Sequence, residues 1–198
     1  MNNKKEILYV SNLISLSRFV LLIVTIYFLL SNFHLHYFQA SGMIVMIWLS
    51  DLLDGYVARK LNQVSELGKI IDPLADKICV ISIGIILLIQ NIIPLWFVLV
   101  IVLRDILIFS GGIYLKYSKK IVPASNWIGK ISVFIIGCTL LFSISIAGIH
   151  HNSLENINIY TIENLELYLH FMFLLSIVMS MVSLIYYSYR FKEIVFNK

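Results

Sequence analysis

The stretch that decides the fold runs from residue 51 to residue 76 and reads DLLDGYVARKLNQVSELGKIIDPLAD. It contains four of the five aspartates in the chain, namely Asp51, Asp54, Asp72 and Asp76. Residues three or four positions apart lie on one face of a helix. The spacing therefore predicts two pairs of carboxylates, one pair on each of two successive helices.

Long apolar runs flank this stretch on both sides, at residues 43–49 and 78–89. Charged side chains at the end of a membrane helix are costly, so they usually serve a function. Four neighbouring carboxylates also repel one another, and protons or cations must offset their charge. Oxygen ligands at this density suit Mg²⁺, Mn²⁺ or Ca²⁺. A pair of such ions can clamp a phosphoryl group during its transfer.

The composition of the whole chain indicates a membrane protein. The 198 residues are 60% hydrophobic, and the mean hydropathy is +0.90. A soluble domain of this size is much less apolar. The sequence pI is near 9.0, but the basic residues are spread along the chain, so we expect no nucleic-acid partner. Both cysteines lie inside apolar runs, which predicts buried thiols and no disulfide.

We predict an all-α integral membrane protein with six transmembrane helices around a polar cavity that opens to the cytoplasmic side. A bilayer core requires about 20 apolar residues per helix. We expect one domain over residues 1–198, with a short juxtamembrane helix within residues 1–11. Because Pro73 suits the first turn of a helix, we expect Asp72 to cap the third span. The predicted spans are residues 12–31, 37–58, 70–90, 93–115, 126–148 and 167–187.

The basic residues predict the orientation of the chain in the membrane. Lysine and arginine occur in every second connecting segment and are absent from the segments between. Cytoplasmic segments carry the excess of basic residues, so both termini and the carboxylates are predicted to be cytoplasmic, in a multi-pass protein of a bacterial-type cell membrane. The segments without lysine or arginine are residues 32–36, 91–92 and 149–166.

The stretch fits the pattern D-x-x-D-G-x-x-A-R-x8-G-x3-D-x3-D at every position, and this pattern resembles the signature of the CDP-alcohol phosphatidyltransferases. Two further segments are similar to that family. Residues 12–18, NLISLSR, resemble its N-terminal segment, and residues 127–130, WIGK, resemble a later Gly-Lys segment. The resemblance covers roughly residues 8–135.

The resemblance implies two divalent ions, Mg²⁺ or Mn²⁺, held by the four aspartates of the stretch. It also implies that Asp76 takes the proton from the acceptor hydroxyl, because a carboxylate in an apolar setting can serve as a base. The family forms homodimers, so a homodimer is expected. The residues implied to bind the CDP-lipid are Gly55, Ala58, Arg59 and Asp51.

Three basic residues are candidates for binding the acceptor: Lys130, Arg18 and Arg104. Arg18 lies about two turns into the first predicted span, and the other two have alternative roles. Lys130 is near a helix end, where lysines commonly extend to the interface. Arg104 is near the middle of its predicted span and can instead belong to an internal charge network. Asp105 follows it directly in the sequence, and we expect its side chain to point elsewhere on the helix.

The implied reaction transfers a phosphatidyl group from CDP-diacylglycerol to an acceptor hydroxyl and releases CMP. Glycerol 3-phosphate is the first choice of acceptor, and phosphatidylglycerol, as used by related cardiolipin synthases, is the second. A metal or proton transporter is an alternative of another class, since membrane carboxylates also mark ion paths. Transport sites lie near the midplane, whereas these four aspartates are predicted near one face. A purely structural subunit would leave the four charges unexplained.

Overall fold

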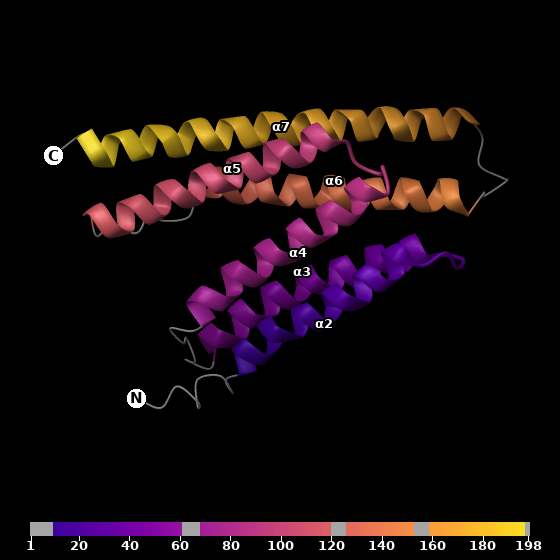
Figure 1. Ribbon diagram of the computed structural model, residues 1–198, viewed down its shortest axis with the longest axis horizontal. Coiled ribbons are helices and arrows are strands. Elements are labelled where there is room, and N and C mark those ends of the chain that lie inside the picture. Colours follow the sequence, from indigo (N-terminus) through magenta and orange to yellow (C-terminus); the bar gives the residue numbers. More distant parts are fainter. Residues whose placement is uncertain (1–9, 61–67, 120–125, 153–158, 197–198) are drawn as a thin grey trace. The chain divides into compact units, whose positions relative to one another are not determined.

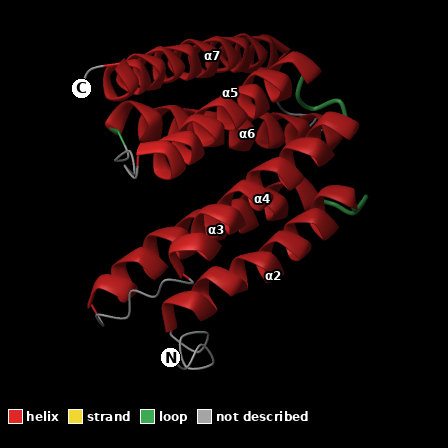
Figure 2. Cartoon of the chain, turned by 60° about the vertical axis from the view of Figure 1, so that its left-hand side comes forward, coloured by secondary structure: helices red, strands yellow, loops and turns green. Residues whose placement is uncertain are grey.

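The computed structural model describes residues 10–60, 68–119, 126–152 and 159–196. Within these ranges every regular element is a helix, which confirms the prediction of an all-α fold (Figures 1 and 2). A π-helical turn, η1 (Leu115–Lys119), continues the fourth of the described α-helices. The α-helices are α2 (Val10–Leu30), α3 (His36–Lys60), α4 (Gly68–Ile89), α5 (Leu95–Tyr114), α6 (Trp127–His151) and α7 (Ile159–Phe196).

The chain divides into two compact units. The first comprises residues 1–92 and 147–154, and the second comprises residues 93–146 and 155–198. The expectation of a single domain over the whole chain stays a prediction.

In the first unit, α2 packs against both α3 and α4. Leu22 and Leu29 of α2 are buried, as are Ile44 of α3 and Leu87 of α4. Such apolar residues, repeated at helical spacing, give each helix one face that it buries against its neighbours. The side-chain amide of Gln90 also donates a hydrogen bond to the Leu29 carbonyl, which joins the end of α4 to the end of α2.

The turn between α2 and α3 is tight and is held from a distant part of the chain. Leu35 has a φ of 65°, in the left-handed region that residues other than glycine seldom adopt. Its N–H donates to Oδ1 of Asn152 at 3.1 Å. A Cβ at Gly148 would lie 3.1 Å from Cβ of Tyr37, so glycine permits this close approach. These contacts fix the first residues of α3.

In the second unit, α5 packs against α7. The rings of Phe97 and Phe173 meet edge to face with centroids 4.7 Å apart. A row of hydroxyl groups, the serine seam, joins α6 to α7. Oγ1 of Thr139 lies 2.7 Å from Oγ of Ser176, and the Ser132 and Ser180 hydroxyls are 3.4 Å apart. Small hydroxyl residues allow close approach between membrane helices and bond across them.

Three of the described helices are long and apolar enough to cross a membrane, over the ranges Leu95–Leu115, Trp127–His151 and Ile162–Phe196. Two further apolar segments, Leu16–Leu30 and Lys77–Ile89, are shorter than a full span within the part of the chain that the structure describes. Together these segments support a membrane protein. The number of spans and the polar cavity stay predictions.

Every described helix end lies within three residues of the predicted position except the two ends of the last helix. The last helix was expected at 167–187 but runs from Ile159 to Phe196. Hydropathy marks only the apolar part of a helix, and the sequence has no glycine or proline between 159 and 196 to end it. α4 begins at Gly68, so Asp72 lies within the helix and the expected cap at this residue is wrong. The juxtamembrane helix was predicted within residues 1–11, of which 1–9 lie outside the described residues.

Candidate active site

The signature stretch ends α3 and begins α4. Asp51 and Asp54 lie in the last ten residues of α3, and Asp72 and Asp76 lie in the first nine residues of α4. The backbone therefore gives each pair of aspartates the helical spacing that the sequence predicts.

Asp51 is the one member of the quartet whose side chain the structure describes. The side chains of the other six signature residues predicted to act in the site lie outside the described residues. Those six are Asp54, Gly55, Ala58, Arg59, Asp72 and Asp76. Their roles stay predictions.

Arg18 of α2 and Asp51 of α3 form an ion pair. Nη2 of Arg18 lies 3.3 Å from Oδ1 of Asp51. The arginine side chain is fully buried, whereas the aspartate side chain is about half exposed. A buried guanidinium is stable where a carboxylate pairs with it, and here that carboxylate belongs to the signature. Arg18 was predicted to bind the acceptor, and the structure places it against Asp51.

The carboxylate of the site that the structure describes, Asp51, is chemically suited to bind a divalent cation. The half-exposed Asp51 carboxylate is open to a hard cation, and Arg18 orients it from one side. Among the described side chains, no three histidine, cysteine or acidic residues gather into a metal-binding group. The described part thus holds one of the four carboxylates that the sequence assigns to metal.

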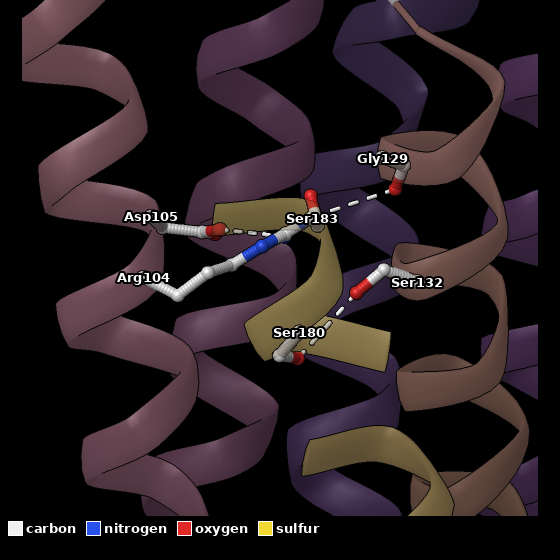
Figure 3. Close-up of polar contacts among 6 residues, drawn as sticks. All are labelled: Arg104, Asp105, Gly129, Ser132, Ser180 and Ser183. Carbon is white, nitrogen blue, oxygen red and sulfur yellow. Dashed lines mark hydrogen bonds and ion pairs between the residues drawn. The ribbon is translucent and has the colours of Figure 1, made fainter. Parts of the chain in front are cut away.

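Arg104 of α5 lies in a separate polar cluster in the second unit, the arginine corner, made of Arg104, Asp105, Gly129 and Ser183 (Figure 3). Nη1 of Arg104 bonds Oδ1 of Asp105 at 2.8 Å. Nη2 donates to the Ser183 hydroxyl at 3.2 Å and lies 3.4 Å from the Gly129 carbonyl oxygen. The arginine is buried and connects α5 with α6 and α7.

The contact between Arg104 and Asp105 corrects the prediction that Asp105 points elsewhere. Successive residues leave a helix about 100° apart, which led us to expect separation. The arginine side chain is long enough to bring its guanidinium back to the neighbouring carboxylate. Of the two roles considered for Arg104, an internal charge network is the one these contacts support.

The first turn of α6 carries Lys130, the third residue predicted to bind the acceptor. Lys130 is exposed, and its Nζ lies 5.5 Å from the centroid of the Trp127 ring, within range of a cation–π contact. The N–H of Asn126 donates to the Tyr187 hydroxyl at 3.4 Å. A lysine at a helix end with its ammonium exposed is compatible with extension to the interface and with ligand binding.

Two buried hydrogen-bond donors near this turn have no acceptor in the part of the chain that the structure describes: Nε of Arg104 and Nδ2 of Asn126. Both groups can only donate. Arg104 reaches the Gly129 carbonyl and Asn126 directly precedes α6, so both donors lie near the backbone turn that carries Lys130. Such surroundings suit an oxyanion.

The comparison with known proteins agrees with the signature. The family described as CDP-alcohol phosphatidyltransferase matches residues 8–189. The chain belongs to this family. It is therefore a phosphatidyltransferase by family, which sets aside the transporter and the structural subunit. The family generally depends on divalent metal ions.

Relatives with two different names are similar to this phosphatidyltransferase. The CDP-diacylglycerol–glycerol-3-phosphate 3-phosphatidyltransferase of Aquifex aeolicus is 31% identical over 193 residues, which is 96% of this chain and 99% of that protein. The Bacillus subtilis protein of the same name is 41% identical over 96 residues, 48% of this chain and 49% of its own length. The cardiolipin synthase (CMP-forming) of Streptomyces coelicolor is 35% identical over 101 residues, 48% of this chain and 46% of that protein.

The sequence did not single out the residues that surround the first turn of α6. Tyr187, Ser183 and Asn126 carry no local motif, and Tyr187 meets Asn126 across 61 positions of the chain. Gly129 did stand within the Gly-Lys segment, but its contact with Tyr187 depends on how α6 packs against α7. These residues come together only through the packing of α6 against α7, which the sequence does not reveal.

Proposed function

We propose that this phosphatidyltransferase transfers the phosphatidyl group of CDP-diacylglycerol to glycerol 3-phosphate, forming phosphatidylglycerophosphate and CMP. The observation that carries the proposal is the similarity to the Aquifex aeolicus enzyme, which extends over 96% of this chain and 99% of that protein. The complete aspartate signature supports the same chemistry.

In the proposed reaction, a hydroxyl oxygen of the acceptor attacks the phosphorus of the phosphatidyl group. The bond from this phosphorus to the CMP oxygen breaks, and CMP leaves. Asp76 accepts the proton of the attacking hydroxyl, a role typically worth about 10²- to 10⁴-fold in rate. Gly55, Ala58 and Arg59, with Asp51, bind the cytidine diphosphate part of the donor along α3.

The four aspartates of α3 and α4 would hold two divalent ions, Mg²⁺ or Mn²⁺. Such ions offset the charge of the pyrophosphate and stabilise the departing CMP. Arg18 contributes by orienting the Asp51 carboxylate with its ion pair. Orientation of a metal ligand by a second residue is commonly worth about 10- to 100-fold in metal affinity or activity.

Lys130 is the residue we propose for the phosphate of the acceptor. Glycerol 3-phosphate is an anion, and four carboxylates repel it unless positive groups face it. The exposed ammonium of Lys130 supports this assignment, as do the donors of Arg104 and Asn126 near the backbone turn that carries it. Arg104 was also a candidate; its buried contacts support a role in shaping this region.

We further propose that six helices cross the membrane around a polar cavity open to the cytoplasmic side, with both termini cytoplasmic. The alternation of basic and non-basic connecting segments supports this orientation. The active site then lies near the headgroups of the inner leaflet, where the pyrophosphate of a lipid donor lies. A homodimer is proposed from the family resemblance.

A second candidate acceptor is phosphatidylglycerol, as in a cardiolipin synthase. The similarity to the Streptomyces coelicolor cardiolipin synthase favours it, over 46% of that protein. The two acceptors differ at the reacting end, because the free glycerol of phosphatidylglycerol carries no terminal phosphate. Lys130 should therefore contribute to the binding of glycerol 3-phosphate and much less to the binding of phosphatidylglycerol.

An acceptor assay on the purified enzyme separates the two. Labelled CDP-diacylglycerol is incubated with glycerol 3-phosphate or with phosphatidylglycerol, and the lipid products are resolved by chromatography. We expect phosphatidylglycerophosphate and CMP in equal amounts from the first mixture. Cardiolipin from the second mixture, without product from the first, would contradict the proposed acceptor.

A further inference from the structure

Gly129, in the first turn of α6, is contacted by residues from two other helices. From α7, Tyr187 lies against it, so closely that a Cβ at Gly129 would be 3.0 Å from the tyrosine oxygen and 3.2 Å from Cε2. From α5, Nη2 of Arg104 reaches the Gly129 carbonyl oxygen (Figure 3). A side chain at position 129 would force Tyr187 to shift by a few tenths of an ångström, so the glycine permits the present contact.

Tyr187 also bonds to the residue that precedes α6. The N–H of Asn126 donates to the tyrosine hydroxyl at 3.4 Å. The first N–H groups of a helix have no acceptor within the helix, and a hydroxyl from another element can supply one. In turn, the N–H of Lys130 donates to the Asn126 carbonyl at 3.1 Å. Tyr187 is thus bonded to the residue that closes the turn carrying Lys130.

We propose that Tyr187 is a positioning residue for the acceptor: through Asn126 and Gly129 it sets the turn of α6 from which Lys130 extends. This inference rests on the proposed function, in which Lys130 binds the acceptor phosphate. Arg104 acts on the same turn from α5. The tyrosine hydroxyl itself does not bind substrate, and its effect reaches the acceptor through Lys130.

The physical reason lies in the length of the lysine side chain. Four methylene groups leave the ammonium many positions, and the turn that carries it decides which of them are accessible. The Trp127 ring, which belongs to the same turn, lies 5.5 Å from the ammonium and restricts it further. A shift of the turn therefore moves both the ammonium and the ring that guides it.

The test is a double-mutant cycle on the purified, full-length enzyme with Tyr187→Phe and Lys130→Ala. Tyr187→Phe removes one hydroxyl, and we expect the acceptor KM to rise about two- to tenfold, the range of one hydrogen bond. The KM for CDP-diacylglycerol, kcat and the unfolding temperature should stay near those of the wild type. In the Lys130→Ala background the same change should alter the acceptor KM less than about twofold, because the two residues act as one unit.

Two further variants make the comparison specific. Gly129→Ala should raise the acceptor KM in the same direction as Tyr187→Phe, since the added methyl group would force Tyr187 to shift by a few tenths of an ångström. Tyr189→Phe is the matched control, because Tyr189 lies two residues away on α7 and is largely exposed. It should leave both KM values unchanged.

The outcomes distinguish this inference from the proposed function. If the wild-type enzyme does not transfer to glycerol 3-phosphate, the proposed function is contradicted. If Lys130→Ala leaves the acceptor KM unchanged, the proposed acceptor site is contradicted. In either case the inference about Tyr187 fails as well. If Lys130→Ala raises the acceptor KM but Tyr187→Phe does not, the function stands and the inference is overturned. Equal rises in both KM values, or additive effects in the cycle, would also overturn it.

Discussion

Among the residues that the structure describes, two arginines are buried, and they serve different purposes. Arg18 is 0% exposed and pairs across helices with Asp51, a signature residue whose side chain is 49% exposed. Arg104 is 3% exposed, and its partners are the neighbouring Asp105, the Ser183 hydroxyl and a backbone carbonyl. The first arginine supports a carboxylate that is open to a ligand, and the second joins three helices.

This difference shows why two arginines predicted to lie within membrane spans need separate interpretations. Both were predicted to bind the acceptor from their charge and their position in a span. A buried cation in a membrane protein requires a partner, and the partner decides what its loss disturbs. Loss of Arg18 should disturb the metal site, and loss of Arg104 should disturb the packing of helices.

Removal of divalent ions should have the largest effect. Excess EDTA is expected to abolish turnover, because four carboxylates without cations repel the pyrophosphate of the donor, and added Mg²⁺ or Mn²⁺ should restore it. The assay measures CMP release from CDP-diacylglycerol. An Arg104→Lys variant should respond to EDTA in the same way, since Arg104 is not among the residues assigned to the metal ions. Full turnover in excess EDTA would contradict the metal assignment.

Loss of Arg18 should weaken the metal site. Arg18→Gln is expected to lower activity by about 10- to 100-fold, because the carboxylate of Asp51 loses the group that orients it. Activity measured across a Mg²⁺ titration should show a weaker apparent affinity for the ion, partly restored at high Mg²⁺.

The matched control for Arg18→Gln is Arg104→Gln, which should leave the Mg²⁺ midpoint unchanged. An equal shift of that midpoint in both variants would remove the distinction between the two arginines.

Loss of Arg104 should lower stability more than it lowers metal affinity. Arg104→Gln is expected to cost about 1.5–3 kcal/mol of unfolding free energy, because the Ser183 hydroxyl and the Gly129 carbonyl lose a charged hydrogen-bond donor. Arg104→Lys keeps the charge but lacks the planar guanidinium with its several N–H donors, so this variant should also be less stable than the wild type. Thermal unfolding in detergent measures both. A stability equal to wild type in both variants would show that the arginine corner contributes little to the fold.

The serine seam between α6 and α7 should contribute least. Ser180→Ala removes the hydroxyl that faces Ser132, and the expected loss is about 0.6 kcal/mol, as is typical of hydrogen bonds between membrane helices. The same thermal unfolding experiment measures it. Ser188→Ala, at an exposed position of α7, is the control. A loss as large as that of Arg104→Gln would mean that the seam, and not the arginine, holds α6 against α7.

The sequence was sufficient to predict the elements that depend on local patterns. The apolar runs predicted six helices, and the spacing of Asp51, Asp54, Asp72 and Asp76 placed two pairs on the helices that carry them. The length of α7 could not be predicted from hydropathy, because a helix without glycine or proline continues beyond its apolar part.

Contacts between distant residues were beyond prediction from the sequence. The pairing of Arg18 with Asp51 depends on how α2 lies against α3. The contact of Tyr187 with Gly129 depends in the same way on α6 and α7. Even the adjacent pair Arg104 and Asp105 was wrongly expected to diverge, because side-chain length outweighed helical spacing.

The most direct test of the account is a comparison of turnover and donor binding in Asp76→Asn. The central claim is that the aspartates of α3 and α4 perform the phosphatidyl transfer, with Asp76 as the base. Asp76→Asn should lower kcat by at least about 10²-fold, the lower end for loss of a general base, while CDP-diacylglycerol binding largely survives. Asp54→Asn should weaken metal and donor binding as well. Equal loss of donor binding in both variants would indicate that Asp76 mainly binds metal, and would contradict its role as the base. Wild-type turnover in Asp76→Asn would contradict the claim as a whole.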